Sequence, residues 1–120
     1  MLERTSNLRS EHIRVLVECL SRMDQLAQQH RPREWEVWAI DEYDEQIAFG
    51  PRYGCGAWFG VTADHKRMRL RRAICDLERG GLLVTWKRRG RRLTNIQLTE
   101  LGKSVSSSLI GADDTEAEMD

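Results

Sequence analysis

Residues 86–94, WKRRGRRLT, place five cationic side chains around one glycine. Guanidinium and ammonium groups donate charge-assisted hydrogen bonds to phosphate or carboxylate oxygens. The runs LLVTWK and RLTNIQLT lie on the two sides of this glycine, and such β-branched and apolar runs around a short turn are typical of a β-hairpin. The sequence therefore predicts a hairpin over 82–99 whose tip carries Lys87, Arg88, Arg89, Arg91 and Arg92.

A second group of cations falls on a helix that we predict over 62–79, capped by Thr62 and ended by two glycines. At about 100° per residue, one side of this helix is apolar and is predicted to be buried. That side holds Leu70, Ala73, Ile74 and Leu77. The opposite side carries His65, Met68, Arg72, Cys75 and Arg79, with Arg69 and Arg71 beside them. A cationic helix surface is therefore expected to face away from the core.

Charge is segregated along a chain whose formal net charge is zero. Residues 60–103 contain 12 Lys and Arg against 4 Asp and Glu, a local charge of +8. Residues 1–59 carry −3, and residues 104–120 carry −5. A block of positive charge attracts a polyanion, although runs of charge are more often simply solvated surface. The position of the cations in the fold decides between these two interpretations.

The length of 120 residues fits one domain, expected over 1–110, that can bury a core without disulfides or metal. No apolar run is long enough to cross a bilayer, and the charged N-terminal residues lack the pattern of a signal peptide. We therefore expect a cytoplasmic protein with no membrane contact. The three cysteines and three histidines are scattered without ligand spacing, so reduced thiols and no metal or cofactor are expected.

Apolar residues recur at three- and four-residue intervals over 10–29, which predicts an N-terminal helix. One stripe holds Ile13, Leu16, Val17, Leu20, Met23 and Ala27, and a second stripe on another side holds Leu8, Val15, Cys19 and Leu26. A helix that is apolar on two sides is covered on two sides. We therefore expect a homodimer through this helix. The alternative is that Val105, Leu109 and Ile110 fold back and cover it.

The segment after Pro32 is predicted to form a second helix over 32–47. Proline is tolerated in the first turn of a helix, and Trp35, Trp38 and Tyr43 keep helical spacing. The alternative is a strand, EWEVWAI, which is less favoured because acidic residues fill the first turns and strand alternation fails.

Two segments are predicted to lack long regular structure. Residues 48–61 contain four glycines and a proline, which indicates a loop anchored by Tyr53, Trp58 and Phe59. Thr99 is expected to cap a short closing helix. Residues 111–120 form an acidic tail that has nothing to bury, and we predict that it is disordered.

The predicted elements give a fold that is mainly α with a small antiparallel β-hairpin, in the α+β class. Residues 69–105, RLRRAICDLERGGLLVTWKRRGRRLTNIQLTELGKSV, cover about a third of the chain. This segment resembles the winged helix-turn-helix proteins, and among them the MarR-like and PadR-like transcriptional regulators. Their pattern is a recognition helix ending in Leu-Glu-x-x-Gly-Leu, a basic wing tip and then Leu-Thr-x-x-Gly. The matching positions are Leu77, Glu78, Gly81 and Leu82, the tip at 87–92, and Leu98, Thr99 and Gly102.

The resemblance implies sequence-specific binding of double-stranded DNA and a role in transcription regulation. The helix over 62–79 would be the recognition helix, and the N-terminal half of it would lie nearest the major groove. That half presents His65, Lys66, Arg67, Met68, Arg69 and Arg72. The arginines of the wing tip would contact phosphates, which position a protein without reading sequence.

The sequence departs from the family pattern at 48–61. A short helix precedes the recognition helix in the family, whereas here a glycine-rich segment holds that place. Either the first helix of the motif is degenerate, or the helix over 32–47 takes its role across a longer loop.

Other functions compete with DNA binding. The aromatic residues of 35–59, together with the acidic run Asp41, Glu42, Asp44 and Glu45, would suit a protein-interaction module. A small-molecule effector would need a pocket, and Trp35, Trp38, Tyr43 and Trp58 are the candidates to line it. An enzyme is the least supported class, because the acidic pairs lack a nucleophile and base in the same stretch.

Overall fold

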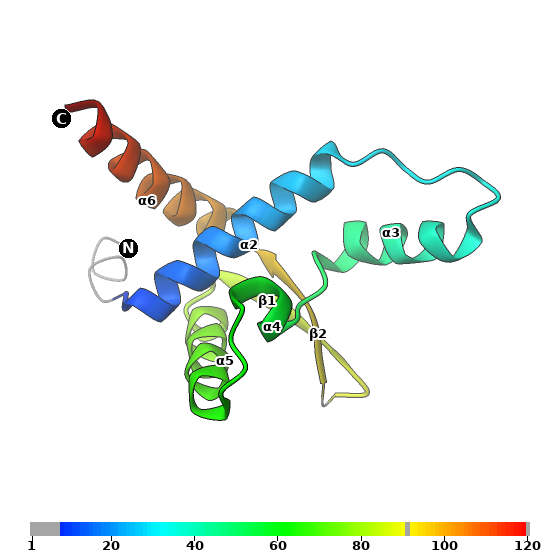
Figure 1. Ribbon diagram of the computed structural model, residues 1–120, viewed down its shortest axis with the longest axis horizontal. Helices are drawn as coiled ribbons and strands as arrows, with labels where there is room; N and C mark the ends of the chain where they lie inside the picture. Colours follow the sequence, from blue (N-terminus) through cyan, green and yellow to red (C-terminus); the bar gives the residue numbers. More distant parts are fainter. Residues whose placement is uncertain (1–7, 91, 120) are drawn as a thin grey trace.

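The computed structural model describes residues 8–90 and 92–119, with side chains for residues 8–90 and 92–111. The elements follow in the order α2 (Ser10–Gln28), α3 (Val37–Phe49), α4 (Cys55–Phe59), α5 (Asp64–Arg79), β1 (Leu83–Arg88), β2 (Arg92–Leu98) and α6 (Glu100–Met119). Figure 1 shows α2 at the centre, α5 and the hairpin below it, and α3 standing out to one side. The predicted class, mainly α with one antiparallel hairpin, is confirmed.

Helix α2 is covered by its own chain on two sides. It buries Val15, Leu16 and Cys19 and contacts α5, α6 and β2. Val105 and Leu109 of α6 pack against the same core. Two of the three residues of the alternative prediction, Val105 and Leu109, therefore pack against the core that α2 helps to form, and the homodimer stays a prediction.

Helix α3 begins at Val37, five residues after the predicted start at Pro32. It is a helix rather than the alternative strand, but it has no buried residue. Trp35 and Trp38 are 72% and 75% exposed. The helical spacing therefore predicted the helix correctly, and these two aromatic residues are exposed because α3 stands away from the body (Figure 1).

The glycine-rich segment 48–61 is more ordered than predicted. Gly50 has φ +99°, and a Cβ at this position would lie 2.5 Å from the carbonyl oxygen of Ile96. Only glycine permits this approach, and it brings the chain against β2. Arg52 pairs with Asn95 as an isolated antiparallel bridge, and Tyr53 N–H donates to the carbonyl of Thr94 at 2.8 Å. A short segment around Arg52 thus pairs with β2 beside the two strands of the hairpin.

Helix α4 follows this pairing, so part of the segment that was predicted to be a loop is helical. It buries Trp58 and Phe59, and it ends at Gly60 in the left-handed conformation. Helix α5 then begins at Asp64, with Ala63 at the N-cap position, so Thr62 is not its cap. The buried face predicted for α5, from Leu70 to Leu77, is confirmed.

Helix α5 ends in a Schellman motif that leads into the hairpin. Leu82 N–H donates to the carbonyl of Leu77 at 2.9 Å, and Gly81 N–H donates to the carbonyl of Glu78 at 3.0 Å. Gly81 has φ +79°, the left-handed conformation that this cap requires. The residues of the Leu-Glu-x-x-Gly-Leu pattern are therefore those that stop the helix and turn the chain.

The junction of β2 and α6 is tied to the start of the hairpin. Thr99 N–H donates to the carbonyl of Leu82 at 3.1 Å, and its hydroxyl donates to the carbonyl of Gly81 at 2.7 Å. The same hydroxyl accepts from Gly102 N–H at 3.0 Å, which caps α6 as predicted. The residues of the Leu-Thr-x-x-Gly pattern thus close the fold at this point.

Helix α6 is longer than the predicted closing helix, and its backbone remains helical through Met119. Residues 111–119 are therefore helical here, where the sequence predicts a disordered tail. Within the described residues, no helix combines the length and apolarity needed to cross a membrane.

Candidate nucleic-acid interface

The N-terminal half of α5 projects beyond the core. All residues from 64 to 69 are exposed, and the first buried residue of the helix is Leu70. Lys66 and Arg67 fall toward the apolar side by helical angle, but they stay exposed because no core reaches the first turns. His65, Met68, Arg69 and Arg72 are also exposed. All the predicted helix contacts are thus accessible to a ligand.

The α5 cations divide between two sides of the helix. Arg69 and Arg72 line a recess of about 350 Å³ with Arg9, the residue before α2, and Glu11 and Asp76 also border it. The pKa of Glu11 is lowered, mainly by a backbone hydrogen bond and the Ser10 hydroxyl and to a smaller extent by Arg69.

Arg67 and Arg71 lie on the other side, near Tyr53. Burial raises the pKa of Tyr53, and the positive charges of these two arginines partly oppose that rise. The helix therefore presents cations around most of its projecting half.

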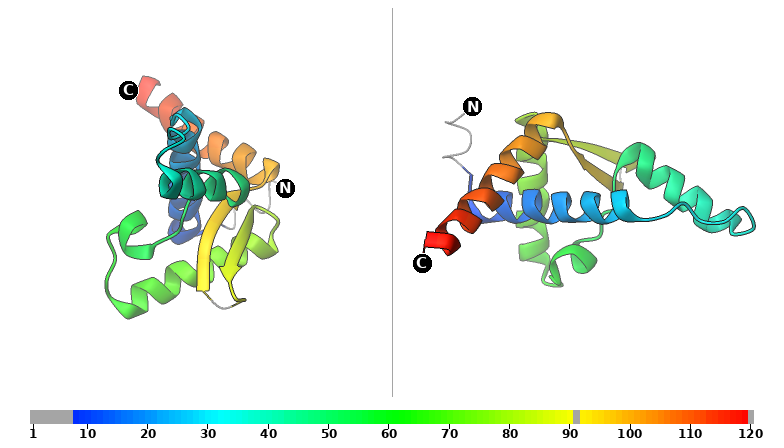
Figure 2. Two further views of the ribbon diagram at one scale, coloured as in Figure 1. Left: turned by 90° about the vertical axis from the view of Figure 1, so that its right-hand side faces the viewer. Right: turned by 90° about the horizontal axis from the view of Figure 1, so that it is seen from above.

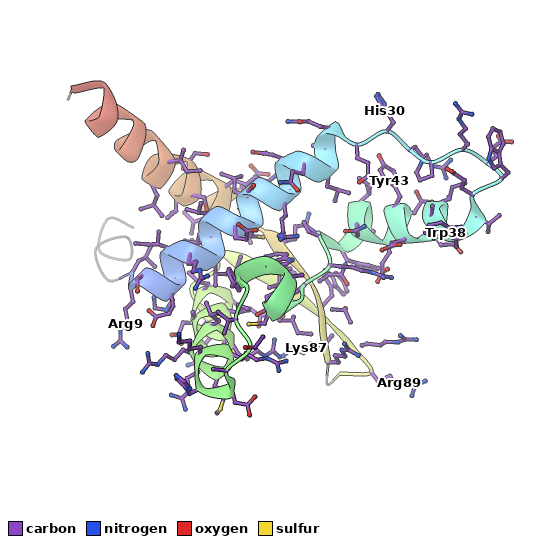
Figure 3. The ribbon with its side chains drawn as sticks, viewed as in Figure 1. Arg9, His30, Trp38, Tyr43, Lys87 and Arg89 are labelled. Carbon is purple, nitrogen blue, oxygen red and sulfur yellow. The ribbon has the colours of Figure 1, made fainter. Side chains whose placement is uncertain are left out.

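The tip of the hairpin is the second cationic surface. Lys87, Arg88, Arg89 and Arg92 are exposed, and Arg91 lies outside the described residues. Arg89 and Gly90 have φ +54° and +72°. Two successive positive φ values are typical of the turn that matches the twist of a hairpin. Figure 3 shows Arg89 at the tip, with its side chain directed away from the body.

The two cationic surfaces lie at the same end of the molecule. Figure 1 and the left view of Figure 2 both place the tip of the hairpin and the N-terminal half of α5 at the lower end. Helix α3, with its acidic residues, and the C-terminal end of α6 lie away from that end in both views. The cations that the sequence distributes over 65–92 are therefore gathered by the fold.

Among the described residues, no acidic side chain forms an ion pair with the cations of α5 or of the hairpin. The ion pairs among the described residues involve Arg22, Arg31, Arg52, Lys103 and His12, and none involves a basic residue of α5 or of the hairpin. One of these ion pairs, between His12 Nε2 and Asp76 Oδ2 at 3.1 Å, joins α2 to α5. The exposed cations are therefore available to an external anion.

The predicted effector pocket is not assembled. Trp35 and Trp38 are exposed, whereas Trp58 is 6% exposed and donates its indole N–H to the carbonyl of Arg52 at 2.8 Å. Trp58 packs edge-on against Tyr53 with ring centroids 5.2 Å apart. In the part of the chain that is described, no three His, Cys, Asp or Glu side chains group as metal ligands would.

Sequence reasoning missed Trp86 as a surface residue. This strand residue is 43% exposed and packs on Phe49 of α3, with ring centroids 4.4 Å apart. Its position in the apolar run LLVTWK indicated only a strand. The contact depends on the placement of α3, which no pattern in the sequence indicates.

Comparison with protein-family models, curated proteins and solved structures finds no match to this chain. Among the described residues, the cations of α5 and of the hairpin form no ion pair and lie at the same end of the molecule, a distribution of charge that attracts anions.

Proposed function

We propose that this protein binds double-stranded DNA in a sequence-specific manner and acts as a transcriptional regulator of the winged helix-turn-helix class. The main support is the pair of cationic surfaces on α5 and on the hairpin, which are exposed at one end of the molecule and form no ion pair among the described residues. In this proposal, helix α4, the connection at residues 60–63 and helix α5 would serve as the helix, turn and second helix of such a motif. The first of the two alternatives for this motif, a short degenerate first helix, fits α4.

Helix α5 is the proposed recognition helix. An α-helix fits the major groove of B-DNA, where arginine pairs two donors with guanine O6 and N7. The projecting half of α5 leaves His65, Arg69 and Arg72 free to reach base edges. Met68 is 57% exposed between them and offers an apolar contact to a thymine methyl group.

The hairpin is the proposed wing. Its tip cations, Lys87 to Arg92, would contact phosphates beside the groove that α5 occupies, and such contacts set register rather than sequence preference. The link between the two elements supports this division, because the Schellman motif leaves only a short turn between α5 and β1. A short connection of this kind would keep the base-contacting residues of α5 and the phosphate-contacting residues of the hairpin at a fixed separation.

Salt dependence gives the quantitative test. Four to six phosphate contacts per subunit predict a slope of log affinity against log salt of about −4 to −5. Fluorescence anisotropy with a random-sequence duplex, from about 50 to 200 mM salt, measures this slope. In the variant Arg88→Ala/Arg89→Ala the slope should become shallower by about 2. A selection of bound fragments from random duplexes would then report sequence preference and half-site symmetry.

A matched control removes two cations elsewhere. Arg31 and Arg33 lie between α2 and α3, and Arg31 pairs with Asp44 at 3.2 Å. The variant Arg31→Ala/Arg33→Ala loses the same charge as the hairpin variant but should keep the wild-type slope. Equal slopes in the wild type and the hairpin variant would remove the role of the wing.

A second candidate function is protein association through α3, supported by its exposed apolar residues. Val37 and Ile47 are 63% and 52% exposed, in addition to Trp35 and Trp38. Exposed apolar groups of this size are typical of interaction surfaces. The homodimer remains a proposal, and with α2 covered by α6 this helix is the better surface for it. Light scattering of the wild type and of Trp38→Ser/Ile47→Ser over a concentration series tests the association.

A further inference from the structure

A groove of about 660 Å³ lies between the C-terminal end of α3 and the hairpin. Its walls include Phe49, Arg52, Trp86, Lys87, Arg88 and Arg92. The volume falls within the range of about 300–1,000 Å³ that small-molecule and cofactor sites occupy. This groove involves no residue of α5, so it is separate from the proposed recognition helix.

The register of the hairpin explains why consecutive residues reach this groove. The pairing shifts between Trp86 and Lys87, because Trp86 pairs with Asn95 whereas Lys87 pairs with Leu93. Thr94 is therefore the extra residue of a bulge in β2, and a bulge interrupts the alternation of side chains between the two faces of its strand. Consecutive β2 residues, Leu93, Thr94 and Asn95, thus line the groove together with Trp86, Lys87 and Arg88 of β1.

One wall of the groove is aromatic and fixed. The Phe49 and Trp86 rings are tilted at 52° with centroids 4.4 Å apart, a favourable arrangement for an aromatic pair. Phe49 packs against the indole of Trp86, and 43% of Trp86 stays exposed. A held, half-exposed indole offers a stacking surface with little further loss of rotamer freedom.

The remaining groups give the groove an excess of positive charge. Arg52 is already neutralised, with Glu45 at 2.7 Å and Glu42 at 3.3 Å. Lys87, Arg88 and Arg92 are exposed and pair with no acid among the described residues. The groove thus combines an aromatic surface with three available cations.

We infer that this groove binds a nucleotide whose base is unpaired, with the base stacked on Trp86 and its phosphates held by Lys87, Arg88 and Arg92. Stacking aromatic residues beside cations are the recurring features of single-strand binding sites. A base inside a duplex cannot offer its face, so the ligand is a single strand or a free nucleotide. This site goes beyond the proposed duplex binding, with which it shares three cations but not its aromatic surface.

The test compares the variants Trp86→Leu and Trp86→Phe with the wild type. The probe is fluorescein-labelled oligothymidylate of eight nucleotides, measured by anisotropy at low salt, with circular dichroism to check folding. Loss of one base stack should weaken binding by roughly 5- to 100-fold in Trp86→Leu. Trp86→Phe keeps a ring and should bind within about threefold of the wild type. The control Trp38→Leu removes an exposed tryptophan outside the groove and should bind as the wild type does.

Two results would overturn the inference: no binding of the oligothymidylate by the wild type, or equal binding by folded Trp86→Leu and wild type. Competition by thymidine monophosphate would assign the groove to free nucleotides as well, and its absence would assign it to a strand; both support nucleotide binding. A duplex titration in parallel separates the two proposals, because Trp86→Leu should retain duplex affinity. A protein that binds the oligothymidylate but no duplex would refute the proposed function alone.

Discussion

The carboxylate of Glu78 joins α5 to the hairpin through Thr85. Its Oε2 accepts a hydrogen bond from the Thr85 hydroxyl at 2.5 Å and another from the Thr85 backbone N–H at 3.3 Å. Glu78 lies in the last turn of α5, and Thr85 lies in the middle of β1. A single side chain therefore adds a second connection between two elements that are already joined by a tight turn.

The variant Thr85→Val should loosen this connection without changing the size of the side chain. Loss of a hydrogen bond to a charged group removes about 1.5–3 kcal/mol of unfolding free energy, which urea denaturation measures. If α5 and the hairpin bind one DNA duplex together, the affinity of the folded variant for duplex DNA should also fall. The control Thr94→Val removes a hydroxyl that bonds only to the carbonyl of Trp86 within β1–β2. Equal stability of Thr85→Val and wild type would show that the turn alone fixes the hairpin.

Gly102→Ala should destabilise the fold, because the added methyl group would collide with the backbone of Leu82. A Cβ at Gly102 would overlap the carbonyl oxygen of Leu82 and lie 3.0 Å from its carbonyl carbon. Overpacking of this kind costs about 1–3 kcal/mol, and thermal melting should show a lower midpoint. Gly56→Ala in α4 is the matched control, since a Cβ there meets nothing within 4 Å. A wild-type midpoint for Gly102→Ala would contradict the tight contact between α6 and the hairpin.

Cys19 should remain an unreactive thiol in the folded protein. Burial raises its pKa from about 9 to about 12. A raised folded-state pKa gives stability that is present below about pH 9 and is lost as pH rises toward 12, because the unfolded chain ionises first. At pH 8, a thiol reagent should modify Cys55 and Cys75, which are half-buried, and reach Cys19 only after denaturant is added. Three thiols reacting at the same rate without denaturant would contradict this burial.

Variants of α5 and of the hairpin should differ in what they do to specificity. Arg72→Ala, on the projecting face of α5, should lower affinity for a selected duplex by about 1–3 kcal/mol and relax the preference at one position. Arg89→Ala should weaken all duplexes by a similar factor. Titration of a selected duplex and a scrambled duplex with each variant makes the comparison. If both variants lowered the affinity for the two duplexes equally, α5 would not be a reading element.

Much of the fold that carries the candidate interface follows from local patterns. The apolar side of α5 was predictable because its residues recur with helical spacing, and the hairpin because two apolar runs enclose a glycine turn. The basic residues are evident from the sequence, and the exposure of Met68, Arg69 and Arg72 follows from their position opposite the predicted buried side of α5. Local chemistry was sufficient for these features since each depends on residues close in sequence.

The features that the sequence did not predict depend on distant contacts. The pairing of Arg52 with Asn95, and the need for glycine at position 50, arise from β2 meeting a segment about 45 residues earlier. The exposure of Trp35 and Trp38 depends on α3 standing apart from the core, which no pattern in the sequence indicates. The indole of Trp86 could not be assigned to a groove before its neighbour Phe49 was placed.

The segregation of charge also makes the molecule an electric dipole. With a formal net charge of zero, the protein has no net-charge attraction to a polyanion. The field of a polyanion nevertheless exerts a torque, which turns the basic end toward it and the acidic α3 outward. Because that field strengthens toward the polyanion, the oriented dipole is also drawn inward, so charge contributes both orientation and a short-range attraction to association. This alignment should fade as the Debye length shrinks from about 30 Å at 0.01 M salt to about 8 Å at 0.15 M.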